Sequence, residues 1–177
     1  MNGYQQAILY LNGAQQEERF CVRNIDRWYI DAVADCFPGY QIFLQNRKAE
    51  GKKDYWCIKS PKVAKPLLSD VSDRDGFARA FIELQGYLLC FPYYCKKRNR
   101  SWIKRKLCIY GAHDDLLFIQ PSIPARQREP IECNTVNGRT FCLLYQSKEE
   151  IGSIIEHFRT GIPCNTSFWD HWAEILR

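Results

Sequence analysis

Residues 2–13 read Asn-Gly-Tyr-Gln-Gln-Ala-Ile-Leu-Tyr-Leu-Asn-Gly, and residues 75–86 read Asp-Gly-Phe-Ala-Arg-Ala-Phe-Ile-Glu-Leu-Gln-Gly. Aligned at an offset of 73, the two stretches share two glycines, an alanine and a leucine. In each stretch an aromatic residue, the alanine, an apolar residue and the leucine fall at positions i, i+3, i+4 and i+7, which form one face of a helix. The pattern predicts an internal repeat built around two similar helices.

Both predicted helices begin after an Asn or Asp suited to N-capping and end at a glycine. The small residues Ala7 and Ala80 would let two helix backbones approach closely. We therefore expect the helices to pack together as the interface between the repeats. The residues assigned to this interface are Tyr4, Ala7, Ile8, Leu11, Gly13, Phe77, Ala80, Phe81, Leu84 and Gly86.

Further along the chain the two copies stay parallel at a larger offset. In the alignment of the two copies Cys21 matches Cys108, Asp26 matches His113 and Ser60 matches Ser147, each 87 residues apart. Because the offset rises from 73 to 87, the second copy carries 14 additional residues. They are expected between its first helix and Cys108, in the stretch 87–106.

The order of the remaining elements is the same in both copies. Each copy predicts a short strand, an apolar helix, a hairpin and a final helix. In copy one the strand is 19–23, the apolar helix is 26–37 and the hairpin is 40–47 with 54–59; the final helix follows Ser60-Pro61, and Pro66 shortens or kinks it. In copy two the strand is 106–110, the apolar helix is 114–123 and the hairpin is 131–135 with 139–145; the final helix follows a Ser147-x-x-Glu150 capping box. Asn137-Gly138 is the strongest hairpin signal.

These elements predict an α+β fold of two pseudo-twofold related αββαββα units, each of which buries one face of its antiparallel sheet under helices. We expect a single pseudo-symmetric domain over residues 1–177, because no Pro/Gly/Ser-rich linker separates the copies. The first repeat is placed at 1–72 and the second, with its inserted hairpin, at 73–160. Residues 161–177, which include Trp169 and Trp172, are expected to add a C-terminal helix that packs on the body.

The composition is that of a globular protein. Of 177 residues, 46% are hydrophobic and 25% are charged, which excludes a disordered or low-complexity chain. The longest apolar run, residues 87–95, is far shorter than the roughly 20 residues that span a bilayer. The start of the sequence has neither the basic nor the apolar region of a signal peptide. We therefore expect an intracellular, cytoplasmic protein with no membrane partner.

The nine cysteines are interpreted as free thiols. Their number is odd and no Cys-x-x-Cys pair occurs, so neither a disulfide framework nor a common zinc pattern is indicated. Most lie in apolar stretches, where a thiol behaves as a small buried hydrophobe. No structural metal is expected.

The densest positive charge lies in the inserted segment. Residues 95–106 contain seven Lys or Arg and no acid. Read as a hairpin with its tip at 97–101, the segment presents Trp102, Lys104 and Lys106 outward. Its other, mainly apolar face, expected toward the core, consists of Ile103, Arg105, Leu107 and Ile109. Basic side chains with an aromatic residue between them suit contact with phosphate and with bases or sugars.

Other basic residues fall at the hairpins of both copies. Hairpin tips are charged in most proteins, and Glu50 and Asp54 dilute the charge of the copy-one tip. The full set assigned to nucleic-acid binding is Arg47, Lys48, Lys52, Lys53, Lys96, Lys97, Arg98, Arg100, Trp102, Lys104, Lys106, Arg126, Arg128 and Arg139.

A glycine-ended helix that occurs twice, each time followed by strands and helices in the same order, resembles the LAGLIDADG homing endonucleases in their single-chain, two-motif form. The resemblance covers about residues 2–160. It implies that the two motif helices form the interface between halves, that the sheets make a basic saddle on the major groove of duplex DNA, and that the residue before each final glycine is an acid that holds divalent metal. The corresponding heptamers are residues 7–13 and 80–86.

This sequence departs from the family at the acid positions, which are occupied by Asn12 and Gln85. Metal-dependent phosphodiester hydrolysis needs anionic oxygen ligands that hold Mg²⁺. A neutral amide offers only one carbonyl oxygen and an NH₂ donor. The two amides could also be ordinary polar residues at helix ends. Three acids near the motif ends could substitute for them: Glu17, Glu18 and Glu83.

From the resemblance we expect a monomeric, non-enzymatic protein that binds double-stranded DNA, without catalytic residues, metal or another cofactor. Three alternatives stay open. The first is an active endonuclease that uses displaced acids with Mg²⁺, the second is an RNA-binding or intron-splicing protein on the same saddle, and the third is a protein-interaction module. No P-loop, dinucleotide-binding or Gly-x-Ser-x-Gly motif competes with these. The target sequence cannot be read from the chain, because base readout depends on geometry.

Overall fold

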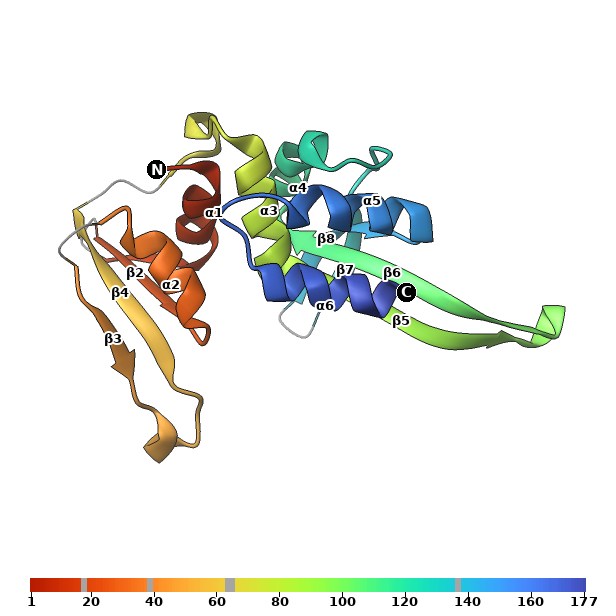
Figure 1. Cartoon of the computed structure of the whole chain (residues 1–177), viewed down its shortest axis with the longest axis horizontal. Coiled ribbons are helices and arrows are strands. Elements are labelled where there is room, and N and C mark those ends of the chain that lie inside the picture. Colours follow the sequence, from red (N-terminus) through yellow and green to blue (C-terminus); the bar gives the residue numbers. More distant parts are fainter. Residues whose placement is uncertain (17–18, 38–39, 63–65, 136–137) are drawn as a thin grey trace. The chain divides into compact units, whose positions relative to one another are not determined.

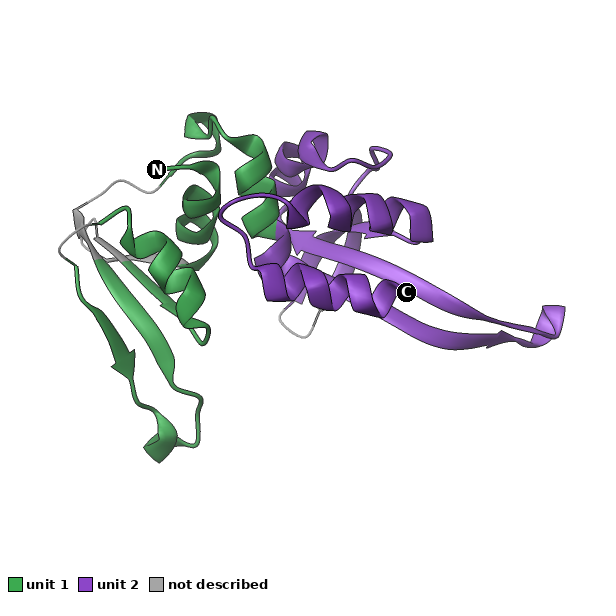
Figure 2. Cartoon of the chain, in the orientation of Figure 1, with its two compact units in different colours: residues 1–81 green, residues 82–177 purple. Residues whose placement is uncertain are grey.

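A computed structural model describes residues 1–16, 19–37, 40–62, 66–135 and 138–177. The chain divides into two compact units, residues 1–81 and residues 82–177 (Figure 2). The boundary falls inside a helix, α3 (Arg74–Gln85), which therefore contributes to both units. No helix of the described residues is long and apolar enough to cross a membrane.

Unit 1 contains one four-stranded antiparallel sheet with the order β1-β2-β4-β3. Its elements are α1 (Gly3–Asn12), β1 (Gly13–Gln16), β2 (Arg19–Asn24), α2 (Arg27–Ala34), β3 (Ile42–Gln45), the short 3-10 turn η1 (Lys48–Glu50), β4 (Tyr55–Lys62), a second turn η2 (Leu68–Asp70) and the beginning of α3. Both α1 and α2 pack on one face of this sheet (Figure 1). Val22 and Ile58 from the sheet and Ile30 and Val33 from α2 are almost fully buried there.

Unit 2 contains a second four-stranded antiparallel sheet, with the order β5-β6-β8-β7. Its elements are β5 (Gly86–Cys95), the turn η3 (Lys96–Arg98), β6 (Arg100–Gly111), α4 (His113–Ile119), the turn η4 (Gln120–Ser122), β7 (Ile131–Thr135), β8 (Gly138–Tyr145), α5 (Lys148–Arg159) and α6 (Thr166–Leu176). Both α4 and α6 contact the sheet, and α5 packs along α6. Leu107, Ile109 and Leu143 are fully buried on this covered face.

The strand pairing confirms the internal repeat. In unit 1 Gly13 lies opposite Val22, and in unit 2 Gly86 lies opposite Ile109. These pairs are related by the two offsets read from the sequence, 73 for the glycine and 87 for its partner. The extra residues of the second copy lengthen the β5–β6 hairpin, as expected. The predicted saddle concerns both sheets together and stays a prediction.

The assumed equivalence of Ser60 and Ser147 is wrong. Arg23 lies opposite Cys57 in one sheet, and Tyr110 lies opposite Cys142 in the other, so the offset in this strand is 85. Ser60 lies within β4, whereas Ser147 is the N-cap of α5 and its hydroxyl accepts a hydrogen bond from the backbone N–H of Glu150.

The prediction of a final helix in copy one is also wrong for the described residues. β4 continues through Ser60 and Pro61 to Lys62, and only the turn η2 follows Pro66 before α3. Proline lacks the N–H that a helix interior requires, and Pro61 and Pro66 both interrupt this segment. The short strand β1 was not predicted, because four residues after a helix give too little alternation. In the hairpin signal Asn137-Gly138, Asn137 lies outside the described residues, and Gly138 begins β8 with a φ of 113°.

Within unit 1, α1 lies beside the beginning of α3 (Figures 1 and 2). The rings of Tyr10 and Phe77 are 5.9 Å apart, and a Cβ at Gly3 would lie 1.8 Å from the backbone oxygen of Asp73. The Asp73 carboxylate accepts hydrogen bonds from the backbone N–H groups of Gly3 (3.1 Å) and Gly76 (2.9 Å). One carboxylate therefore caps α3 and ties α1 to it.

The observed contacts refine the expected helix interface. Its apolar members other than Leu11 and Leu84 have no exposed surface; these are Tyr4, Ala7, Ile8, Phe77, Ala80 and Phe81. Gly86 serves a different contact, because a Cβ there would lie 2.8 Å from the Trp172 ring of α6. The cap of α3 is Asp73, one residue before the helix begins, and the aligned position Asp75 lies inside the first turn.

Candidate nucleic-acid interface

Each sheet has one face covered by helices and one open face. Because side chains alternate along a strand, the residues of the open face follow from the pairing register. In unit 2 they include Lys104 and Lys106 on β6 and Cys142 and Leu144 on β8, opposite in direction to the buried Leu107. The register agrees with the predicted outward direction of Trp102, Lys104 and Lys106. The prediction that Ile103 faces the core is wrong, because the hairpin projects beyond the rest of the sheet there and Ile103 is 47% exposed.

The β5–β6 hairpin extends beyond the other two strands of its sheet, because β8 pairs only with residues 107–111 of β6. We call the projecting part, residues 89–106, the arm (Figure 1). At its tip Asn99 adopts a left-handed conformation with a φ of 45°, and its side chain accepts a hydrogen bond from the Tyr94 hydroxyl at 2.7 Å. The arm is thus a two-stranded ribbon whose two faces are both exposed.

One face of the arm combines aromatic rings with cations. The rings of Tyr93 and Trp102 lie 5.1 Å apart, edge to face, and the Lys104 ammonium lies 4.9 Å from the Tyr93 ring. Trp102 is 38% exposed, and it lines a hollow together with Arg98 and Arg100. Among the described residues, no ion pair involves any of the seven cations of residues 95–106. Their charge is therefore available to a polyanion.

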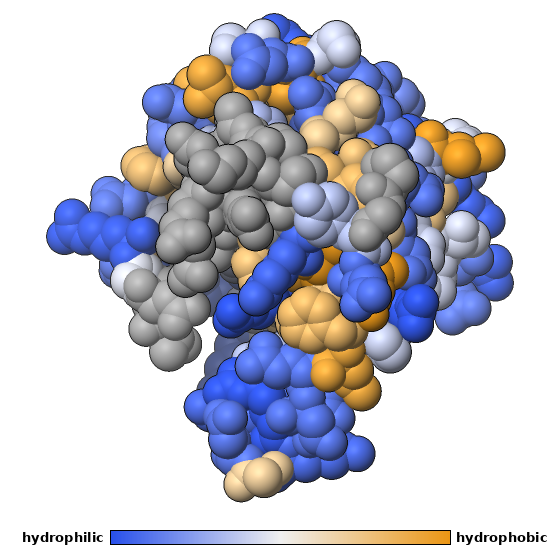
Figure 3. Space-filling view, turned by 90° about the vertical axis from the view of Figure 1, so that its left-hand side faces the viewer, coloured by the Kyte–Doolittle hydropathy of each residue, from blue (hydrophilic) through white to orange (hydrophobic). Residues whose placement is uncertain are grey.

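The tip of the β3–β4 hairpin, residues 46–54, differs in this respect. The Arg47 guanidinium binds Glu50 and the Tyr55 hydroxyl, Lys52 lies 3.4 Å from Glu50, and Lys48 lies 3.9 Å from Asp54. Lys53 is exposed. Figure 3 shows this tip as a hydrophilic lobe at the lower edge. Its positive charge is partly neutralised by its own acids.

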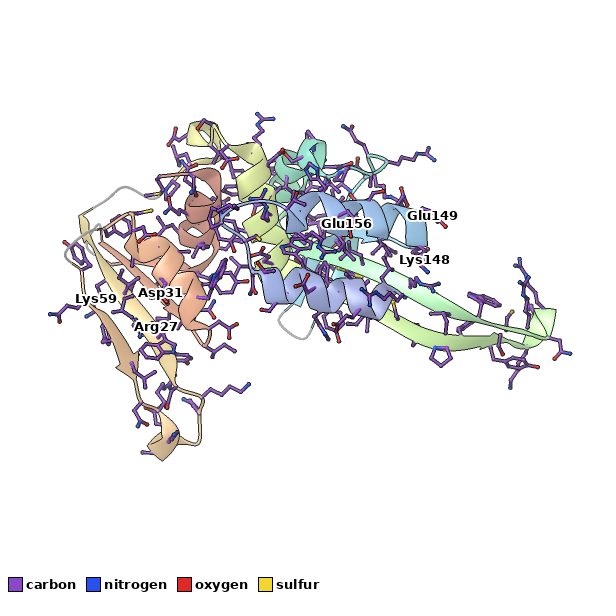
Figure 4. All side chains as sticks on the ribbon, viewed as in Figure 1. Arg27, Asp31, Lys59, Lys148, Glu149 and Glu156 are labelled. Carbon is purple, nitrogen blue, oxygen red and sulfur yellow. The ribbon has the colours of Figure 1, made fainter. Side chains whose placement is uncertain are left out.

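The open face of the unit 1 sheet carries two cations that the sequence reasoning missed. Arg23 on β2 lies opposite Cys57, and Lys59 on β4 lies opposite Cys21, so all four side chains share one face. Arg23 and Lys59 are exposed, and Lys59 points away from α2 (Figure 4). Phe43 on β3 adds an exposed ring on the same face. Alternation within the two strands was the signal that could have identified them.

The three arginines near the β7–β8 hairpin have different environments. Arg126 is exposed. Arg128 binds Glu150 and the carbonyl oxygen of Leu144, and its guanidinium lies 4.9 Å from the Tyr145 ring. It therefore fastens the loop that precedes β7 to β8 and α5. Arg139 lies 3.5 Å from Glu132 and stays largely exposed. We therefore leave Arg128 out of the binding surface proposed below.

Neither motif-end residue suits a divalent cation. Asn12 ends α1 with its Nδ2 buried and without a hydrogen-bond partner, and Gln85 ends α3 half-buried. Whichever way such an amide is turned, it supplies one neutral oxygen, whereas Mg²⁺ is held in proteins by carboxylates. Among the described residues no group of three His, Cys, Asp or Glu side chains could hold a metal ion.

The acid nearest to the second motif end has another role. The Glu83 carboxylate is only 7% exposed and accepts hydrogen bonds from the Trp169 indole and, at 3.0 Å, from the backbone N–H of Asn165. It therefore fastens the start of α6 to α3. Glu83, one of the three acids named as possible substitutes, is thus engaged in a contact between helices. The other two candidate acids, Glu17 and Glu18, lie outside the described residues.

No protein-family model and no curated protein sequence matches this chain. Solved structures, by contrast, match its fold over 99% of its length. They are LAGLIDADG homing endonucleases, and this chain has their fold. The sequence prediction of an α+β fold of this type is confirmed.

Three of these structures illustrate the likeness. I-LtrWI bound to its target DNA gives a TM-score of 0.67 at 10% identity, with 89% of that chain covered. The K262A mutant of I-SmaMI gives 0.66 at 7% identity with 91% covered, and I-AabMI bound to uncleaved DNA gives 0.62 at 7% identity with 90% covered. The fold is therefore retained at very low sequence identity.

Proposed function

We propose that this protein binds double-stranded DNA through the open faces of its two sheets and does not cleave it. The relatives of the same fold include I-LtrWI, described as bound to target DNA, and I-SmaMI, described as bound to cleaved DNA. The binding residues of this chain are Arg23, Lys53, Lys59, Tyr93, Lys96, Lys97, Arg98, Arg100, Trp102, Lys104, Lys106 and Arg126. The protein acts as a monomer, since one chain carries both sheets.

The observation that carries the proposal is the arm. Seven cations, none of them in an ion pair within the described part of the chain, lie on a ribbon about 12 residues long, and two-stranded ribbons enter the major groove of B-DNA. Cations of the arm would neutralise backbone phosphates and release counterions. The exposed pair of Tyr93 and Trp102 would pack against sugars or bases.

The absence of cleavage follows from the chemistry of the motif ends. Hydrolysis with a divalent metal needs ligands that balance its charge and hold the water that it activates. Asn12 and Gln85 supply no charge, and Glu83 is engaged with α6. We infer that this chain retains DNA binding and has lost the nuclease centre, with no cofactor.

Salt dependence of duplex binding tests the proposal. For the parent chain, log affinity should fall linearly with log salt, by about 0.9 for each phosphate contacted. Replacing Lys96, Lys97, Arg98 and Arg100 by Ala should flatten the slope by about three units. A parent chain whose binding shows no salt slope, or a variant with the parental slope, would contradict the role of the arm.

A further inference from the structure

The open face of the unit 2 sheet holds three cysteines around one hollow. Cys108 on β6, Cys142 on β8 and Cys133 on β7 line it together with Lys106 and Tyr110, and its volume is about 170 Å³. Cys108 and Cys142 are diagonal neighbours, since Cys108 pairs with Leu144 and Tyr110 pairs with Cys142. Cys108 and Cys142 are 8% and 6% exposed, and they lie on the face opposite the helix-covered core.

The Cys108 thiol is placed to ionise. A hydrogen bond from the Cys142 thiol, a second from the Tyr110 hydroxyl and the nearby Lys106 ammonium lower the pKa of Cys108 to about 6, against the opposing effect of burial. The Cys142 S–H also lies 3.4 Å from the carbonyl oxygen of Leu143, and a thiolate at Cys108 is the stronger acceptor. A thiolate with a second thiol in contact is the arrangement of a reactive cysteine with a resolving partner.

We propose that Cys108 and Cys142 form an oxidation site that reacts with hydroperoxides and is covered when DNA is bound. The Cys108 thiolate attacks one peroxide oxygen, the O–O bond breaks, and Cys108 becomes a sulfenic acid while hydroxide leaves. The Cys142 sulfur then attacks the Cys108 sulfur, the S–O bond breaks, and a disulfide and water form. The two thiols lose two electrons in total, and the peroxide accepts them.

The duplicated fold supplies an internal control. Cys21 and Cys57 occupy the matching diagonal in unit 1. There, however, Cys57 has no exposed surface, whereas Cys108 and Cys142 both border the hollow. Since oxidation follows the exposure of a thiol as well as its ionisation, the unit 1 pair should react more slowly than the unit 2 pair.

The test uses the full chain and mass spectrometry. Trypsin places the three cysteines of the hollow in separate peptides, residues 107–126, 129–139 and 140–148, and it places Cys21 and Cys57 in residues 20–23 and 54–59. After limited hydrogen peroxide at pH 7, the cross-link of 107–126 with 140–148 should form about tenfold faster than that of 20–23 with 54–59. Cys142→Ser should abolish this cross-link and leave Cys108 as a sulfenic acid that dimedone traps.

A second experiment adds saturating duplex DNA before the peroxide, and its expected result rests on the proposed function. Occupied protein should form the cross-link at least about fivefold more slowly, while oxidation of Cys36, which lies outside both sheets, should be unchanged. If Cys108 oxidises no faster than Cys21 without DNA, the site does not exist. If oxidation is fast and bound DNA gives no protection, the covering is wrong. If no duplex binds at all, the proposed function fails while the peroxide result decides the thiol site separately.

Discussion

At the scale of single residues, two carboxylates at the helix α3 stabilise the fold by hydrogen bonding. Glu83 accepts hydrogen bonds from Asn165 and Trp169, and Asp73 accepts one from Gly3, so each carboxylate joins elements distant in sequence. Asp73 also caps its own helix through the N–H of Gly76. No sequence pattern announces such contacts, because the partners lie about 70 to 86 residues away. The repeat pointed to Asp75 as the cap, and the structure uses Asp73.

Glu83 offers a stability test. In Glu83→Ala, two buried N–H donors lose their acceptor, and unsatisfied buried donors cost about 1–3 kcal/mol each. We expect the free energy of unfolding to fall by about 3 kcal/mol, measured as the urea midpoint followed by tryptophan fluorescence. The control is Glu156→Ala, whose side chain is exposed on α5 and forms an ion pair with the neighbouring Arg159, with an expected change within about 0.5 kcal/mol (Figure 4). Equal effects of the two substitutions would contradict the fastening role of Glu83.

Asn12 and Gln85 offer a test of lost chemistry. Asn12→Asp combined with Gln85→Asp would replace two neutral amides by carboxylates that can hold Mg²⁺. We expect the double variant to nick supercoiled plasmid in Mg²⁺ or Mn²⁺ and the parent chain to leave it intact. The matched control, Asn12→Ser with Gln85→Ser, should be inactive. Parental nicking that survives this serine control would show that a nuclease uses other acids.

At the scale of elements, the two hairpins that look equally basic in sequence have different electrostatic environments. Positive charge at the β3–β4 tip is paired with Glu50 and Asp54, whereas the arm has no acid within residues 95–106. Composition gave a hint of this difference through the acids in the first tip. Only the ion-pair geometry shows that three of the four cations there already have partners.

A matched charge deletion tests this difference. Replacing Arg47, Lys48, Lys52 and Lys53 by Ala removes the same formal charge as the arm variant. Since three of these cations are already paired, we expect the salt slope of duplex binding to flatten by about one unit, against about three for the arm. Fluorescence anisotropy over a salt series measures both. A tip variant that loses as much slope as the arm variant would contradict the unequal roles of the hairpins.

Elements were predictable where periodicity was long, and less so where it was short. The helices α1 and α3, the hairpins and the lengthened β5–β6 ribbon followed from helical spacing, alternation and the change of offset. The strand β1, four residues long, and the continuation of β4 through Pro61 did not, because local signals compete there with sheet pairing. Alternation in β2 and β4 contained Arg23 and Lys59, which the emphasis on hairpin tips overlooked.

At the scale of the whole molecule, the duplication accounts for the architecture. Two sheets with the same strand order follow two similar helices, and the repeat was legible because each copy kept its aromatic, alanine and glycine positions. The fold of LAGLIDADG homing endonucleases is retained at 7–10% identity, while the residues at the motif ends lack the charge that cleavage requires. Under the proposed function, this chain would keep the binding of duplex DNA without the cutting.

Gel analysis of a random duplex library tests this account most directly. The chain is mixed with end-labelled random-sequence duplexes in low salt with Mg²⁺, bound and free species are separated on a native gel, and each lane is then resolved on a denaturing gel. We predict a retarded fraction whose strands all keep full length. Shortened strands in the retarded fraction, or no retarded fraction at any protein concentration, would contradict the claim that the chain binds duplex DNA without cleaving it.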